Sequence, residues 1–209
     1  KYEEASVNIK RSIELSRSIG DKFQLANSLE LLSFIYFEKS DYNRAHELCD
    51  QAYLIAKDIA NDKLEMLCLR TLGVLHNELG NLSRAREYLE RSSDFFRDVE
   101  ETQKYNVTLY WRTVLYNGIG DYSKALSTAK QGLRISQQLG FKTGQAFLLS
   151  EIGDIYYSLG NFDKALDYNK RALAISDKYI GKWSREKCMN AIGYVYLERG
   201  NMEKALDYF

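Results

Sequence analysis

The chain has 209 residues, 45% hydrophobic and 28% charged, which fits one large folded domain or two small ones. Its 29 basic and 29 acidic residues give a formal net charge of zero, which argues against nucleic acid and against an anionic membrane as partners. The apolar runs are only a few residues long, too short to span a bilayer. Proline is absent, as suits a chain that is nearly all helix.

In chain order, the first predicted element is one helix from residue 1 to about residue 19, the second half of a partial repeat over 1–20. Full repeats follow over 21–60, 61–100, 101–140 and 141–180, and a partial repeat over 181–209, in a single array spanning 1–209. Each full repeat reads as two antiparallel helices of roughly 17–18 residues. A forty-residue period carries this prediction, because alanines recur in one phase: Ala5, Ala45, Ala85, Ala125, Ala165 and Ala205.

A corner is predicted in the middle of each repeat. Five residues before each alanine except the first stands a helix-ending residue, followed by Asp or Asn: Ser40-Asp41, Gly80-Asn81, Gly120-Asp121, Gly160-Asn161 and Gly200-Asn201. Glycine ends a helix well because it adopts a left-handed conformation cheaply. The Asp or Asn side chain can then cap the next helix.

Apolar and small residues precede each corner at helical spacing, as in Leu149, Ile152, Gly153 and Tyr156. Small residues let paired helices approach closely. This Leu-Gly-Tyr-Ala pattern resembles the tetratricopeptide repeat family. Three departures are a period of forty instead of thirty-four, a missing late Pro, and Leu or Met at the leading aromatic position. The repeat holding Arg112 and Thr113 also lacks the Leu-Gly pair.

The resemblance implies an all-α, right-handed superhelical solenoid of antiparallel helix pairs. It also implies that the first helices of successive repeats line a concave groove. On each first helix, the residues beside the apolar face that packs into the core are our candidates for a peptide-binding groove. They are Phe34, Phe37, Arg70, Val74, Asn77, Tyr110, Trp111, Val114, Phe147, Glu151, Asp154, Tyr157, Lys187, Asn190 and Tyr194.

The predicted groove is rich in aromatic and acidic residues. Tyr and Trp are enriched at binding hot spots. Six acidic residues (Glu30, Glu38, Glu78, Glu151, Asp154 and Glu198) face two basic ones, Arg70 and Lys187. We therefore expect a protein or peptide partner with apolar anchors and some Lys or Arg. The alternative for any one aromatic is burial as core by tight curvature.

No cofactor, metal site or catalytic residue is expected, and the chain is not predicted to be an enzyme. No Walker, nucleotide-binding, serine-hydrolase or zinc-protease motif is present. His46 reads as a surface residue and His76 as a packed one. Cys49, Cys68 and Cys188 show no zinc or disulfide spacing and read as buried free thiols of a reducing, cytoplasmic compartment.

The resulting hypothesis is a non-enzymatic protein–protein interaction module that binds a peptide or helical segment in its groove. The alternative is the sensory or regulatory repeat region of a larger bacterial signalling enzyme or transcription regulator. The sequence starts without Met and ends inside a predicted helix, so we expect a fragment whose uncapped ends associate end to end.

Overall fold

The computed structural model describes residues 2–180 and 182–209, and this part of the chain is helical, with no strand. The helices are α1 (Tyr2–Ile19), α2 (Lys22–Glu38), α3 (Tyr42–Asp58), α4 (Asp62–Glu78), α5 (Leu82–Asp98), α6 (Thr102–Gly118), α7 (Tyr122–Gln138), α8 (Lys142–Ser158), α9 (Phe162–Tyr179), α10 (Lys182–Glu198) and α11 (Met202–Tyr208). Within these described ranges, no helix is both long enough and apolar enough to cross a bilayer.

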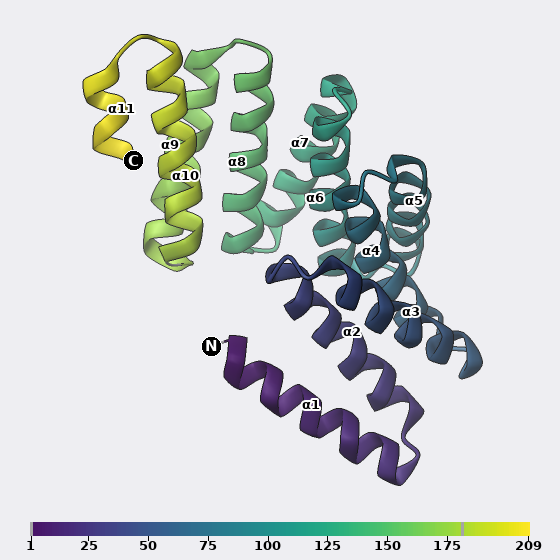
Figure 1. Cartoon of the computed structure of the whole chain (residues 1–209). Coiled ribbons are helices and arrows are strands. Elements are labelled where there is room, and N and C mark those ends of the chain that lie inside the picture. Colours follow the sequence, from purple (N-terminus) through teal and green to yellow (C-terminus); the bar gives the residue numbers. More distant parts are fainter. Residues whose placement is uncertain (1, 181) are drawn as a thin grey trace. The chain divides into compact units, whose positions relative to one another are not determined.

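The chain forms two compact units, Lys1–Glu100 and Glu101–Phe209. The first unit holds α1–α5 and the second holds α6–α11. Within each unit, every helix packs against the next one along the chain, as the neighbouring ribbons of Figure 1 show. The predicted all-α stack of helix pairs is therefore confirmed. The boundary between the units coincides with the predicted end of the repeat over 61–100.

The helix corners return every twenty residues, both in the middle of the predicted repeats and at the bounds between them. The expected mid-repeat corners have positive φ at Ser40, Gly80, Gly120, Gly160 and Gly200. The turns between repeats use the same left-handed conformation, at Gly20, Ala60, Glu100 and Gly140. Three of these nine residues, Ser40, Ala60 and Glu100, are not glycine.

Side-chain caps begin most of the helices that follow these corners. Asp41, Asp121, Asn161 and Asn201 each accept a hydrogen bond from the backbone N–H three residues on, as expected. Asn81 makes no such bond. Such a cap typically contributes about 1 kcal/mol.

Glycines inside the first helices make room for large residues sixteen positions later. A Cβ added at Gly73 would lie 2.8 Å from Leu89 Cγ, and one at Gly153 would lie 2.4 Å from Asn169 Nδ2. The repeat without this glycine has Thr113 there, and sixteen residues later it has the small Ala129. The two positions thus compensate in volume, as close-packed interiors require.

Within the described residues, only the first helices of the repeats form a second set of contacts. In the first unit α2 packs against α4; in the second, α6 packs against α8 and α8 against α10. The second helices, where described, make no such contacts with one another. The first helices therefore form the inner layer of each unit. This layer carries the residues singled out from the sequence.

Candidate functional site

The aromatic side chains of the inner layer remain accessible. Phe34 and Tyr194 are exposed, at 38% and 54% of their full surface. The other five candidates are half-buried: Phe37, Tyr110, Trp111, Phe147 and Tyr157. None of the seven is fully buried core, so each keeps some surface for a ligand.

In the first unit, the candidate face on α2 and α4 is partly closed by its own contacts. The Thr71 hydroxyl donates to Glu30 Oε1 at 2.7 Å, and Glu30 is buried. Burial lowers the pKa of the Arg70 guanidinium, and the nearby Glu30 charge works in the opposite direction. Val74 is only 4% exposed, which differs from the open position expected for it. The Val74 side chain therefore belongs to the core and not to an open groove.

The remaining candidates of the first unit lie toward the ends of α2 and α4. Phe34 and Phe37 stack with ring centroids 5.8 Å apart. The half-buried Asn77 donates from Nδ2 to Glu78 Oε1 at 3.5 Å. These residues form an aromatic patch and a polar edge.

In the second unit, aromatic rings connect α6 to α8. Tyr110 lies 5.7 Å from Phe147 and 4.9 Å from Trp111, measured between ring centroids. Val114, one turn further along α6, is half-buried. Edge-on and tilted ring pairs of this kind add about 0.5–1.5 kcal/mol to the burial of their area. They hold the rings in fixed orientations on the inner layer.

Charged groups follow the aromatic rings along α8 and α10. Lys187 Nζ donates to Glu151 Oε1 at 2.8 Å, and Glu151 is only 5% exposed. Burial disfavours the Lys187 ammonium, yet the charges of Glu151, Tyr110 and Asp154 together raise its pKa. Burial, followed by the Glu151 charge, raises the pKa of Asp154 to about 7, although Lys187 and Asn169 work against this shift. Two carboxylates therefore share one ammonium.

A pocket of about 330 Å³ opens beside these charges, and we call it the α8/α10 pocket. Its walls are Asp154, Tyr157, Ser158, Lys187, Asn190, Ala191 and Tyr194. Five of the sequence candidates thus meet in one cavity: Asp154, Tyr157, Lys187, Asn190 and Tyr194. Tyr157 is held in place by its hydroxyl, which donates to Glu198 Oε1 at 3.2 Å. The pocket combines aromatic surface, a carboxylate, an ammonium and an amide.

Asn169 is a residue of this region that the sequence analysis missed. It lies on α9 at 0% exposure, where its carboxamide packs against the backbone of Gly153. It is near enough to Asp154 to favour the charged carboxylate. Neither its Nδ2 nor its Oδ1 completes a hydrogen bond of ordinary geometry within the described residues. The repeat does carry a sequence signal for Asn169, because the equivalent positions of the other repeats hold Cys49, Leu89 and Ala129, none of which has a carboxamide.

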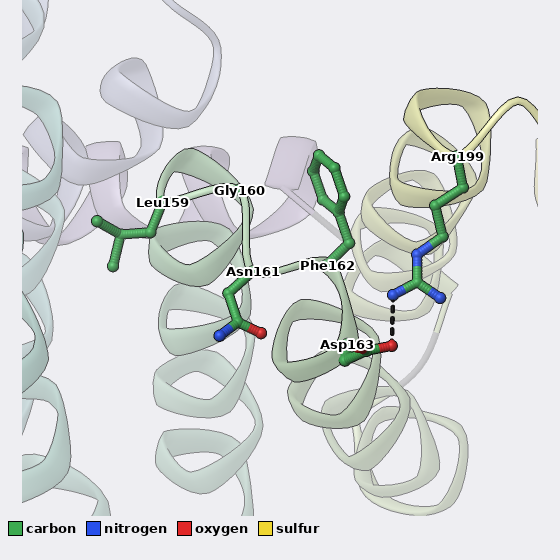
Figure 2. Close-up of a pocket in the computed structure, with 6 residues that line it drawn as sticks. All are labelled: Leu159, Gly160, Asn161, Phe162, Asp163 and Arg199. Atoms are coloured by element: carbon green, nitrogen blue, oxygen red, sulfur yellow. Dashed lines mark hydrogen bonds and ion pairs between the residues drawn. The ribbon is translucent and has the colours of Figure 1, made fainter.

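A second hollow, of about 430 Å³, lies at the corner between α8 and α9. Figure 2 shows its lining, with Arg199 reaching across to pair with Asp163. Most of its wall is the turn itself, from Leu159 to Phe162. The Asp163 side chain is 91% exposed, and exposed pairs of this kind contribute about 0–1 kcal/mol. This hollow therefore belongs to the corner and offers little binding chemistry.

The two histidines meet in the first unit, on the side of α4 that packs against α3 and α5. Their ring centroids lie 5.2 Å apart, and His46 Nδ1 pairs with Asp50 at 2.9 Å. His76 is buried as expected, and its burial, followed by the His46 and Arg84 charges, lowers its pKa. Across residues 2–180 and 182–209, no three metal-ligating side chains come together. Cys49, Cys68 and Cys188 are buried free thiols.

The comparisons with known proteins agree with this architecture. In the structure of BtubC from P. vanneervenii, 88% of that chain aligns with all of this one at TM-score 0.75 and 20% identity. A STAND protein with a tetratricopeptide repeat sensor, PH0952 from Pyrococcus horikoshii, aligns over 34% of its length and all of this chain at TM-score 0.72 and 20% identity.

NprR in complex with its cognate peptide NprX aligns over 58% of its length and 95% of this chain, at TM-score 0.77 and 15% identity. A sequence search of curated proteins finds no match. The tetratricopeptide repeat model matches residues 24–98 and 144–209, more than half of the sequence. The chain therefore belongs to the tetratricopeptide repeat family.

Proposed function

We propose that this chain is a non-enzymatic protein–protein interaction module that binds a peptide or helical segment along the inner layer of first helices. The observation that carries the proposal is the α8/α10 pocket, where aromatic rings and polar groups from two repeats line one cavity. Cavities with a few convergent polar groups are the usual binding sites of proteins. The partner contributes apolar anchors and some Lys or Arg.

Two further features favour a peptide ligand. Tyr and Trp bury a large area at low entropic cost, and the inner layer presents four such rings on its first helices: Tyr110, Trp111, Tyr157 and Tyr194. Asn190, in the pocket of the second unit, and Asn77, on α4 of the first unit, each supply an amide group that can bond a peptide backbone. NprR, which has the same fold, was solved with a peptide bound. The likeness supports a peptide ligand here without identifying it.

A peptide selection tests the proposal. Peptides are selected from a random-sequence display library on the purified chain and re-measured on the triple variant Phe34→Ala, Trp111→Ala and Tyr194→Ala. We expect binding to fall at least tenfold while helix content by circular dichroism is unchanged. The control variant, Leu54→Ala with Tyr179→Ala, removes exposed side chains from second helices and should bind like the wild type. Equal binding by the triple variant would refute the inner-layer model.

A second candidate is a sensory or regulatory region of a larger signalling protein. The likeness to PH0952 favours it, because that protein carries its repeats as a sensor and this chain matches about a third of it. In this reading, ligand binding to the inner layer changes the activity of a second domain. Sequencing the gene on both sides of these 209 residues decides between the two. A catalytic or DNA-binding domain beside them supports the sensor, and repeats alone support the simple adaptor.

A further inference from the structure

The charges around the α8/α10 pocket are unbalanced. The buried Glu151 carboxylate is neutralised by Lys187, whose Nζ lies 2.8 Å from its Oε1. Asp154 is then a second carboxylate beside a cation that is already paired, and it lies in the wall of the cavity. Buried charge is costly unless it is paired. When both carboxylates are ionised, the pocket therefore lacks one positive charge.

The cavity wall next to Asp154 is aromatic. Tyr157 and Tyr194 both line the pocket, and their rings are held by contacts outside it. The Tyr157 hydroxyl bonds Glu198, and the Tyr194 ring packs 5.2 Å from Phe209, measured between centroids. Aromatic faces attract cations, and a guanidinium both stacks on rings and pairs with a carboxylate through two N–H groups. An ammonium offers only a compact, strongly hydrated charge.

We propose that the α8/α10 pocket is a subsite for one guanidinium-bearing side chain, received by the Asp154 carboxylate beside the Tyr157 and Tyr194 rings. This inference rests on the proposed function, in which the side chain belongs to a bound peptide. Asn190, also in the wall, lies in place to accept from the remaining guanidinium N–H groups or from the peptide backbone. The subsite selects for arginine at one position of the partner.

The buried surroundings of Asp154 support this assignment. From α9, Asn169 lies against Asp154 at 0% exposure, and its polar atoms complete no hydrogen bond of ordinary geometry within the described residues. The titratable groups that face Asp154 are Glu151 on α8 and Lys187 and Cys188 on α10. Tyr110 on α6 acts on Lys187 from the other side. None of these groups supplies a free cation.

Binding at this subsite is coupled to a proton. Because the pKa of Asp154 is about 7, a cation that requires the ionised carboxylate releases part of a proton when it binds at neutral pH. Lowering the pH from 8 to 6 protonates most of the free carboxyl groups. The affinity should then fall about tenfold, whereas an ordinary aspartate near pKa 4 would give no change over this range.

The test uses N-acetyl-arginine amide as the probe, titrated into the ¹⁵N-labelled chain and followed by NMR. We expect binding in the millimolar range, with shifts centred on Ala191 and Tyr194. N-acetyl-citrulline amide has the same shape without the charge and should not bind. Asp154→Asn should abolish binding of the arginine probe together with its pH dependence. Asp163→Asn, which removes an exposed carboxylate on α9, should leave both intact.

Three results would overturn the subsite. These are equal binding of the citrulline probe, binding of N-acetyl-lysine amide at least as tight as that of the arginine probe, and unchanged binding by Asp154→Asn. The outcome is separable from that of the peptide selection. If peptides bind through the inner layer but the arginine probe does not, the subsite is wrong and the proposed function stands. If the arginine probe binds and no peptide does, the pocket still receives a guanidinium and the proposed function is wrong.

Discussion

Replacing Gly153 by alanine should destabilise the second unit, although alanine is the better helix former. In an open helix position the change gains up to about 1 kcal/mol. At Gly153 the new Cβ would lie 2.4 Å from Asn169 Nδ2 and 2.7 Å from its Cγ, and Asn169 is fully buried. Overpacking of this kind costs about 1–3 kcal/mol. With the full helix gain subtracted, the net loss should be about 0–2 kcal/mol.

Two companion variants isolate the contact. Gly118→Ala has nothing within 4 Å of its new Cβ and should be neutral or stabilising. In an Asn169→Ala background the clash is gone, so Gly153→Ala should change sign and stabilise the unit by up to about 1 kcal/mol. Urea unfolding followed by tryptophan fluorescence reports on this unit, since both tryptophans lie in Glu101–Phe209. The same destabilisation in both backgrounds would refute the volume argument.

Three further predictions concern packing and charge. Ala125→Leu and Ala165→Leu, both at fully buried sites, should each cost about 1–3 kcal/mol of unfolding free energy, and an unchanged melting temperature for both would contradict the helix contact. Because its pKa is lowered, His76 binds fewer protons in the native state than in the unfolded state, so the free energy of unfolding should fall as the pH drops below about 6.5. His76→Tyr should reduce that pH dependence, as measured by urea titrations at pH 7.5 and 5.5. Lys187→Met should leave the buried Glu151 unpaired and cost about 1–3 kcal/mol of unfolding free energy. This is less than for a fully buried pair because the Lys187 side chain is 36% exposed. A variant with wild-type stability in urea would show that the pair is dispensable.

The repeated corners could be predicted because their chemistry is local. Gly160 followed by Asn161 ends one helix and caps the next through contacts within a few residues. The turns at Ala60 and Glu100 adopt the same conformation with residues that give no such signal. There the flanking helices impose the left-handed residue, which costs a non-glycine residue roughly 1–2 kcal/mol. Tertiary packing, invisible in a single sequence, overrides local preference at these positions.

The sequence indicated which positions of the candidate site share a layer, but not the contacts that each of them makes. Helical spacing and the repeat period identified five residues that line the α8/α10 pocket, because equivalent positions of successive repeats fall on the same layer. The pairing of Glu151 with Lys187 spans 36 residues, four short of the repeat, so the period does not indicate it. The burial of Val74 and the approach of Asn169 to Gly153 depend on how closely two helices pack. Distances of that kind are set by all the neighbouring side chains together.

The most direct test of the account is a photo-crosslinking measurement at two alanines of the second unit. A photoreactive benzoylphenylalanine replaces either Ala191, in the wall of the α8/α10 pocket, or Ala174, exposed on the second helix α9. A peptide selected on the wild-type chain is then irradiated with each variant. Crosslinks should form at position 191 and be nearly absent at position 174. Crosslinks at position 174 with none at position 191 would contradict the claim that the inner layer binds the partner.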